Sequence, residues 1–510
     1  MKNFFYTLSR WFVSLHWFAF KTQTGMIFLF VVYSITIQAQ TQQYTLPEVV
    51  QLAREQSISA KQAATRRNTN YWQYRSFVAD FKPQLSLNGT LPGFTRSFIE
   101  VVQPDGTISF QPVSNNNSML NMALTQNIAA TGGTVFVQQQ LQRFDDFARN
   151  NTRYNGIPFA VGLSQPLFRF NEMKWSRKIE PLRFQEGNQQ YLSSLEEVAL
   201  NATNYYFDLL IAQVNLQIAE KNRSNNDTLY KIAQQKLQLG KISQNDLLQL
   251  QMGLLTAQKD LASAQQSAAV ASLRLKMYLS MRNESSLALA IPQEAPEFII
   301  DTQVALAEAY ANRADAVGFQ RRLLEAERDS QKARKENGLN ASLEAAFGFS
   351  NQGARPGEVY INPQDREFVQ LQFTLPIMTW GRNKARTEIA RANQEFVQQS
   401  VEQDKLTFEQ EIFTQVTLLQ MLQKQVKLTK LTDEIAANRY QIAQDRFILS
   451  DLSVTDLGIA TQEKARARRD YILALRDYWQ AYYSLRLLTL YDFEKNEKLA
   501  GAGEANGNFN

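Results

Sequence analysis

The stretch KLQLGKISQNDLLQLQ at Lys236–Gln251 has a counterpart 210 residues later, RFILSDLSVTDLGIAT at Arg446–Thr461, and this match decides the predicted fold. Both stretches contain the spacing Ser-x-x-Asp, in which a serine caps a helix N-terminus and an acid three positions later completes a capping box. Each is therefore predicted to be a tight turn that leads into a helix. The alignment pairs Gly240 with Ser450, Ser243 with Ser453, Asp246 with Asp456 and Leu247 with Leu457.

The repeat extends beyond the turns. LSQPLF at Leu163–Phe168 matches TLPIMTWG at Thr374–Gly381, and the same offset of 210 relates Pro166 to Pro376. Towards the N-terminus the offset is nearer 256, so the first half carries about 46 extra residues between its first and last strands. Each half is predicted to contain a helix, strands, a long helix, a turn and a second helix, with the prolines at the strand–helix junctions.

Apolar residues in the first long helix recur at alternating steps of three and four, which is the seam of a left-handed coiled coil. The seam consists of Leu195, Val198, Ala202, Tyr205, Leu209, Ala212, Leu216 and Ala219. The long helices are predicted at 171–238 and 379–448, and at 1.5 Å per residue each is about 100 Å long, too long for a compact domain. Four helices of about half that length are expected to pack end to end beside them, at 47–80, 244–281, 303–337 and 454–490.

The predicted strands alternate apolar and polar residues, as where Val369, Leu371 and Phe373 are separated by Gln370 and Gln372. The same alternation occurs at 85–88, 159–164 and 342–347. This pattern suits a transmembrane β-barrel with lipid outside and water inside, so Val369, Leu371 and Phe373 are predicted to face lipid. A soluble, half-buried sheet is the alternative, but the export signal described below and the lack of a separate apolar domain favour the barrel.

Two hairpins are predicted in the longer first half. One runs from Met119 to Leu141 with Thr131-Gly132-Gly133 as its turn, and a shorter one lies around Pro104-Asp105-Gly106. Whether residues 92–157 add strands to the barrel or form an insertion outside it stays open. Four to six strands are too few to close a transmembrane barrel, whose minimum is about eight, and open sheet edges are not tolerated in lipid. Several chains must therefore pool their strands.

The first 39 residues have the composition of a signal peptide. Met26–Ile37 is a 12-residue apolar run, preceded by basic residues and followed by Gln38-Ala39-Gln40. Such a run is too short to span a membrane as a helix, and cleavage is expected after Ala39. The leader carries three of the five net positive charges, so the exported chain is nearly neutral and has no electrostatic footprint for nucleic acid.

The composition excludes most catalytic chemistry. The chain has no cysteine, and its only histidine is His16, in the leader. Disulfides, metal sites built on Cys or His, and nucleophiles that depend on either residue are thereby excluded. We predict no catalytic residue, cofactor or metal site. An enzyme that uses carboxylates alone has no supporting pattern in the sequence.

Over roughly residues 44–491 the chain resembles the TolC family of outer-membrane efflux and secretion channels. The resemblance rests on the internal repeat, the junctions at Pro166 and Pro376, and the turns LGKISQNDL and SDLSVTDLG. It implies a mainly helical fold in which long coiled-coil helices form a periplasmic α-barrel and a smaller set of strands contributes to a shared transmembrane β-barrel. It also implies a homotrimer in the outer membrane of a Gram-negative bacterium, each chain giving four strands to a barrel of twelve.

On this basis the chain divides into five parts. They are a signal peptide at 1–39, a first repeat at 40–281, a linker or equatorial segment at 282–302, a second repeat at 303–491, and a C-terminal tail at 492–510 that is expected to be disordered. The long first-half insertion falls within the first repeat.

The resemblance places Asp456 where channels of this family carry an inward-pointing aspartate at the periplasmic constriction. Three copies would turn one residue into a ring of carboxylates that attracts cations. The alternative role for Asp456 is to cap its helix. The full set predicted for the periplasmic tip or gate is Asp456, Asp246, Ser243, Ser453, Gly240 and Ser450.

The chain departs from the family pattern at three positions near this turn. The family's second aspartate is Ile459 here, and the basic residue and tyrosine that help to lock the closed state elsewhere are Leu452 and Phe447. A ring with half the charge is expected to bind divalent cations less tightly. The closed state must then be held by other contacts, for which Asp246 is a candidate.

The leading functional hypothesis is a trimeric exit duct for efflux or type I secretion. Substrates would reach it from an inner-membrane transporter and a periplasmic adaptor (a membrane fusion protein), both docking at the helical tip. A passive porin-like channel without energised partners is the alternative, but it would need no helical extension of about 100 Å. A structural or adhesive coiled-coil protein would be purely helical, which the alternating strands contradict. A duct lined by Gln, Asn and Ser is permissive, so the sequence predicts no particular substrate.

Overall fold

A computed structural model of the chain describes residues 43–282, 287–292, 295–296, 298–449 and 451–499. The predicted signal peptide, Ser450 and residues 500–510 lie outside the described residues. Two helices of 67 residues each dominate the rest, α3 (Glu172–Gln238) and α7 (Arg382–Ile448), as predicted from the coiled-coil seam. Pro181 lies within α3. Among the described helices, none contains a stretch that is both long and apolar enough to cross a membrane.

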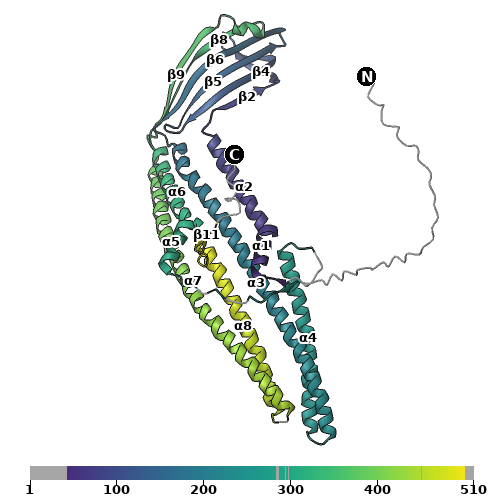
Figure 1. Cartoon of the computed structure of the whole chain (residues 1–510). Coiled ribbons are helices and arrows are strands. Elements are labelled where there is room, and N and C mark those ends of the chain that lie inside the picture. Colours follow the sequence, from purple (N-terminus) through teal and green to yellow (C-terminus); the bar gives the residue numbers. More distant parts are fainter. Residues whose placement is uncertain (1–42, 283–286, 293–294, 297, 450, 500–510) are drawn as a thin grey trace, which may run out of the picture. The chain divides into compact units, whose positions relative to one another are not determined.

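Shorter helices pack along α3 and α7 and divide them into two zones. In the zone next to the turns, α4 (Gln244–Tyr278) packs on α3, and α8 (Val454–Thr489) packs on both α7 and α3. In the zone next to the sheet, α2 (Ile58–Ala79) packs on α3, and α6 (Ala314–Glu336) packs on both α3 and α7. The helices that meet the sheet therefore follow the order α2, α3, α6, α7 (Figure 1).

The predicted helices 47–80 and 303–337 are each two helices. α1 (Leu46–Gln56) precedes α2 and α5 (Thr302–Asn312) precedes α6, and the breaks fall at Ser57 and Arg313, whose ψ angles of 150° and 146° are extended. At the first break Ser57 Oγ accepts a hydrogen bond from the backbone N–H of Ala60 at 3.1 Å and so caps the new helix. The prediction of single helices was wrong because one extended residue leaves the apolar periodicity on either side intact.

Seven strands form one antiparallel sheet at one end of these helices (Figure 1). They are β2 (Gln84–Thr90), β3 (Phe94–Val102), β4 (Ile108–Ile128), β5 (Gly133–Asp146), β6 (Asn151–Leu167), β8 (Asn340–Gly353) and β9 (Gln364–Thr374). Their order is β2-β4-β5-β6-β8-β9, and β3 follows β2 along the outer part of β4. A short 3₁₀ helix, η1 (Pro356–Tyr360), connects β8 to β9.

Both predicted hairpins are present in this sheet. The β3–β4 turn contains Gly106 at φ 84° and the β4–β5 turn contains Gly132 at φ 76°, left-handed conformations that favour glycine. Residues 92–157 therefore add strands to the sheet. The count of four strands per chain, implied by the family resemblance, is too low for this sheet because the insertion pairs with its neighbours on both sides.

Glutamines of the two long helices hold the segment between the repeats. Within that segment β7 (Ala288–Leu289) pairs in parallel with β1 (Gln43–Tyr44). Gln213 of α3 donates to the carbonyl oxygen of Leu287 at 2.6 Å, and Gln423 of α7 donates to that of Phe298 at 3.2 Å. Positions 213 and 423 are 210 apart, so they are equivalent in the two repeats, and in each repeat a glutamine of the long helix hydrogen-bonds the connecting segment.

The main apolar core lies where α1 and α5 pack against α3, α7 and α8, and its largest fully buried side chains include Tyr206, Phe207 and Tyr478. Beyond α8 the chain forms a hairpin of β10 (Tyr491–Asp492) and β11 (Glu497–Lys498). Phe493 joins the core with 8% of its surface exposed. Residues 492–499, the described part of the predicted disordered tail, are therefore folded.

Candidate functional site: the sheet faces and the two helical turns

Cross-strand pairing sorts the sheet residues onto two chemically different faces, because residues directly opposed in an antiparallel sheet share a face. One row across five neighbouring strands is apolar throughout: Leu85, Leu124, Val137, Val161 and Phe347. A row on the opposite face is polar throughout: Asn127, Thr134, Ser164, Glu344 and Gln370. The alternation seen in single strands is thus in register across each of these rows, and the apolar row ends at β9, where Glu367 lies opposite Phe347.

The residues predicted to face lipid belong to the apolar face. On β8 the residues opposite Val369, Leu371 and Phe373 are Ala345, Leu343 and Ala341. The exposed fractions of Val369, Leu371 and Phe373 are 77%, 58% and 70%. A contiguous apolar surface of this kind is unfavourable in water and marks a surface that another apolar phase or partner covers.

The two outer strands of the sheet keep one side unpaired. In the described part of the chain β2 pairs only with β4, and β9 pairs only with β8. Their unpaired N–H and C=O groups need hydrogen-bond partners wherever water is excluded. β2 runs from α2 away from the helices, whereas β9 runs back towards α7, so the two edges have opposite directions.

The prolines lie where the strands give way to the long helices. Pro166 is the penultimate residue of β6, and Pro376 lies between β9 and α7. After each proline the chain passes through a left-handed non-glycine residue, Phe168 at φ 62° and Trp380 at φ 50°. Trp380 is 91% exposed at this end of the apolar face, the kind of position that aromatic residues occupy at membrane–water interfaces.

The α3–α4 turn is fixed by its glycine and by a complete capping box. Gly240, at φ 67°, donates its backbone N–H to the carbonyl oxygen of Leu237 at 2.9 Å and so ends α3. The N–H of Asp246 donates to Ser243 Oγ at 3.2 Å, and the N–H of Ser243 donates to Asp246 Oδ2 at 3.0 Å. Hydrogen bonds from the Ser243 hydroxyl and backbone hold the pKa of Asp246 below its ordinary value.

The α7–α8 turn uses the same pair of residue types. The N–H of Asp456 donates to Ser453 Oγ at 3.1 Å, and that hydroxyl donates to Asp456 Oδ2 at 2.7 Å. Asp246 and Asp456 thus each bond within their own turn, and the capping role is present for both. An ion pair that the sequence analysis did not identify crosses this turn, with Arg446 Nε 3.0 Å from Asp451 Oδ2.

Apolar packing also closes the α7–α8 turn. A small buried cluster there consists of Tyr440, Ala443, Phe447, Leu457 and Ala460, with Leu229 and Leu452 packed against it. Two of the departures from the family pattern, Phe447 and Leu452, therefore place apolar side chains in this packed cluster. The resemblance led us to expect a tyrosine and a basic residue at these two positions. The third departure, Ile459, is 45% exposed.

Each turn presents an exposed leucine at the end of its long helix. Leu239 and Leu449 are the C-cap residues of α3 and α7, and they are 71% and 79% exposed. They are also 210 residues apart, so the same feature occurs in both repeats. A single exposed leucine is ordinary, but a repeated one at both turns makes the turns candidates for contact with another protein.

A groove of about 950 Å³ separates the α3–α4 pair from the α7–α8 pair near the turns. Asn222, Asn225 and Asn226 contribute to its lining. Asn225 bridges the two pairs by donating to the Tyr440 hydroxyl at 2.8 Å. Across the described ranges, no three His, Cys, Asp or Glu side chains gather into a cluster that could hold a metal ion.

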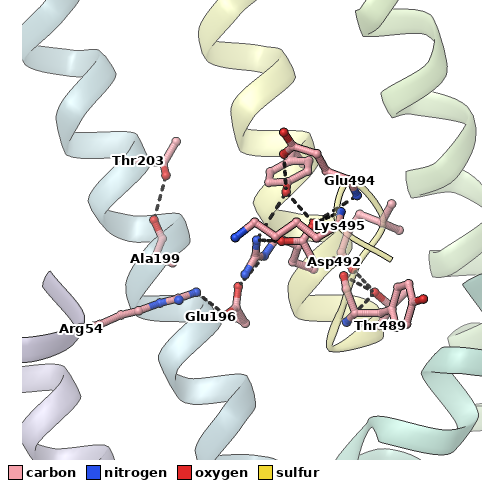
Figure 2. A network of polar contacts seen from close by, with 12 residues as sticks. Arg54, Glu196, Ala199, Thr203, Thr489, Asp492, Glu494 and Lys495 are labelled. Atoms are coloured by element: carbon pink, nitrogen blue, oxygen red, sulfur yellow. Dashed lines mark hydrogen bonds and ion pairs between the residues drawn. The ribbon is translucent and has the colours of Figure 1, made fainter. Parts of the chain in front are cut away.

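A cluster of four charged residues, in which Glu196 and Asp492 are buried and Arg54 is partly exposed, joins the N-terminal helix α1, the long helix α3 and the C-terminal hairpin (Figure 2). Glu196 of α3 contacts Arg54 of α1 and accepts from Arg486 Nε of α8 at 3.1 Å, and Arg486 Nη1 donates to Asp492 Oδ2 at 2.6 Å. Burial opposes the charge on Arg486, but Glu196 and Asp492 outweigh it and raise the pKa of the guanidinium. The sequence signal for this cluster is a glutamate inside the apolar seam, next to Leu195.

Comparisons with known proteins agree with this architecture. The model of the family described as outer membrane efflux protein matches residues 49–280 and 305–489. The Campylobacter jejuni CmeC outer membrane channel is 16% identical with a TM-score of 0.63, over 90% of this chain and 88% of that one. CusC, a protein that forms a transmembrane channel, is 16% identical with a TM-score of 0.61, over 87% of this chain and 91% of that one.

The open state of the Neisseria gonorrhoeae MtrE outer membrane channel is a further structural relative. It is 15% identical with a TM-score of 0.61, over 89% of this chain and 90% of that one. No curated protein matches the chain. At these identities the structural similarities establish the fold, and the family match covers most of both repeats.

Proposed function

The chain belongs to the outer membrane efflux protein family and resides in the outer membrane, and from this premise we propose that three copies form an exit duct of a tripartite efflux or type I secretion system. The long helices extend into the periplasm in this arrangement. Residues 1–39 direct export and are removed. A periplasmic adaptor and an inner-membrane transporter deliver substrates at the helical turns.

One observation carries this proposal: a single chain joins a two-faced sheet to helices of 67 residues. At 1.5 Å per residue such a helix is about 100 Å long, several times the thickness of a bilayer's hydrocarbon core. The apolar face of the sheet suits lipid and the polar face suits a water-filled lumen. A passive porin-like channel, which needs only the transmembrane barrel, would not require helices of this length.

The open edges of the sheet support assembly from several copies. Unpaired strand edges are not tolerated in lipid, and the edge strands β2 and β9 run in opposite directions. The β2 edge of one copy can therefore pair with the β9 edge of the next as an antiparallel ladder. Repeating this contact three times closes a barrel without leaving an edge.

The turns are the surface that we assign to the periplasmic partners. Leu239 and Leu449 are exposed at both turns, at the end of the helices opposite the sheet (Figure 1). Three copies would present six such turns in a ring, a repeated apolar surface for an adaptor with helical hairpins of its own. A passive porin, the alternative function, would leave these leucines without a partner.

We propose that Asp456 also contributes to the gate. Its carboxylate lies in the first turn of α8 and is exposed. Around a three-fold axis it would form a ring of three carboxylates, which raises the local concentration of cations in a narrow opening. Its bond to Ser453 leaves Asp456 Oδ1 available to the lumen, so capping and gating are compatible roles.

Photo-crosslinking in living cells tests the choice between duct and porin. A photoreactive amino acid replaces Leu239 or Leu449 at the turns, and the control position is Ile58, which is 63% exposed at the break between α1 and α2. We expect both turn positions, and not Ile58, to crosslink to a periplasmic adaptor identified by mass spectrometry. An assembled channel in the outer membrane with no adaptor crosslink at either turn would favour the passive porin.

A further inference from the structure

We propose that the hairpin formed by β4 and β5 is part of the membrane wall, so that three copies close a barrel of eighteen strands. The family resemblance implies four strands per chain and a barrel of twelve. The inference rests on the proposed trimer and deepens it, because the number of strands sets the width of the outer opening.

Strand order provides the first argument. β2 follows α2 and β6 leads into α3, so a chain without the insertion would pair β2 directly with β6. Here β4 and β5 lie between them (Figure 1). β4 pairs with the whole of β2, Gln84–Thr90, and β5 pairs with β6 from Thr134 to Asp146. The hairpin is thus hydrogen-bonded on both sides, as an internal part of a wall must be.

The chemistry of the hairpin provides the second argument. Leu124 and Val137 belong to the apolar row that continues onto β2, β6 and β8, and Asn127 and Thr134 belong to the polar row. Leu124 is 42% exposed on the apolar face. A hairpin that only decorated the outside of the cell would not need apolar and polar faces in phase with its neighbours.

The β4–β5 turn provides the third argument, because it is fastened at the helical end of the sheet. Next to the α2–β2 junction, Gln126 donates to the carbonyl oxygen of Phe81 at 2.8 Å. At the β6–α3 junction, the Asn171 side chain donates to the carbonyl oxygen of Ala129 at 3.0 Å. Asn171 is also the N-cap of α3, accepting from the backbone N–H of Lys174. The hairpin therefore starts at the level of the helix junctions and rises through the full height of the sheet.

The barrel can still close with six strands from each chain, counting β2 and β3 as one because both pair along β4 at the same edge. Successive strands alternate in direction, so an even number leaves β2 and β9 with opposite directions, and neighbouring copies can pair them antiparallel. An odd number of added strands would have made the junction between copies parallel. The insertion of a complete hairpin preserves the rule that all neighbours in the barrel are antiparallel.

The widths of the two parts of the chain also agree. Strands spaced about 4.8 Å apart and tilted about 40° give six strands a width of about 38 Å and four strands only about 25 Å. The four helices that meet the sheet, α2, α3, α6 and α7, occupy about 36–40 Å at interaxial distances of 9–10 Å. An eighteen-stranded barrel is about 36 Å across between backbones, against about 24 Å for twelve strands.

Engineered disulfides in assembled channels test the placement of the hairpin, and the exported chain contains no native cysteine to interfere. Opposed residues on adjacent antiparallel strands have Cα atoms about 4.5–5.5 Å apart, within the range that a disulfide spans. The proposal predicts that the cysteine pairs Leu85→Cys with Leu124→Cys, and Val137→Cys with Val161→Cys, crosslink within one chain in outer membranes. It predicts no crosslink for Leu85→Cys with Val161→Cys.

The outcomes separate this inference from the proposed function. A trimer in which positions 85 and 161 crosslink while positions 85 and 124 do not would overturn the eighteen-stranded barrel and leave the trimeric duct standing. A native mass other than three chains, with both predicted disulfides formed, would instead overturn the trimer and hence the count of eighteen. The proposal stands if both predicted disulfides form in a protein whose native mass is three chains.

Neutral polymers of graded size measure the width independently. Added to the outer side of a planar bilayer, a polymer that enters the barrel lowers the conductance, whereas an excluded polymer does not. We expect the cut-off diameter to exceed that of a twelve-stranded relative measured in the same way by about 12 Å, the difference between the two backbone diameters, because barrel diameter grows linearly with strand number. An equal cut-off would contradict the wider barrel.

Discussion

At the first turn of α4, the Ser243 hydroxyl accepts a hydrogen bond from the backbone N–H of Asp246, and the Asp246 carboxylate accepts one from the backbone N–H of Ser243. The helix itself leaves such N-terminal N–H groups unpaired. Ser243→Ala removes the acceptor for the N–H of Asp246, and we expect a local cost of about 1 kcal/mol. Hydrogen exchange at residues 243–247 should accelerate several-fold, whereas Ser243→Thr should stay close to wild type because it keeps the hydroxyl. Unchanged exchange in Ser243→Ala would show that the cap does not stabilise this turn.

At the equivalent turn, capping and charge can be separated at Asp456. Asp456→Asn keeps an oxygen that can accept from Ser453 but removes the charge, whereas Asp456→Ala removes both. If three Asp456 carboxylates line the gate, both variants should lose cation preference in single-channel recordings, and Asp246→Asn should lose less. Cation preference that persists in Asp456→Asn would leave Asp456 with the capping role alone.

Glu196 is the residue whose loss should disturb the largest part of the chain. It is 5% exposed and contacts both Arg54 and Arg486, so Glu196→Ala leaves two guanidinium groups without their shared partner. Removing one member of a buried ion cluster costs about 3–5 kcal/mol. Trypsin should then cleave at Lys495 and Lys498 faster than in wild type, with Glu196→Gln in between. Equal cleavage in all three proteins would contradict a role for the cluster in holding the C-terminal hairpin.

Among the elements, β9 offers the cleanest test of which face meets lipid. Phe373 and Gln372 are neighbours on one strand and point to opposite faces. Arginine on the lipid face at the bilayer midplane costs about 2–4 kcal/mol, less nearer the interface, so Phe373→Arg should reduce the amount of assembled oligomer. Gln372→Arg, which places the same charge towards the lumen, should assemble like wild type. Equal assembly of the two variants, measured on semi-native gels, would contradict the assigned orientation.

Elements with a strong local signal were predictable, and pairings between distant elements were not. The seam from Leu195 to Ala219 specifies α3, and the caps at Ser243 and Ser453 specify both turns, because periodicity and capping depend on neighbouring residues. The place of β4 and β5 between β2 and β6 depends on strand pairing within some 80 residues of chain, which no local pattern encodes. The cluster around Glu196 was missed for the same reason, since its four members come from distant segments.

In the whole molecule each of the two repeats contributes both to the sheet and to the long helical part. Each repeat supplies strands to one sheet, a long helix and a turn, and the insertion in the first repeat widens the sheet without disturbing the helices. The sheet has an apolar face and two open edges, so one copy alone is an incomplete membrane structure. Assembly of copies is thus the feature on which the duct, the gate and the wide barrel all depend.

Native mass measurement on protein extracted from the outer-membrane fraction tests this central claim most directly. Cells are fractionated, the outer membranes are dissolved in a mild detergent, and the mass of the intact complex is recorded after the detergent is stripped in the spectrometer. We predict that the chain is found in the outer-membrane fraction and that its complex has three times the mass of the processed chain. A monomer recovered in the soluble fraction would contradict the account.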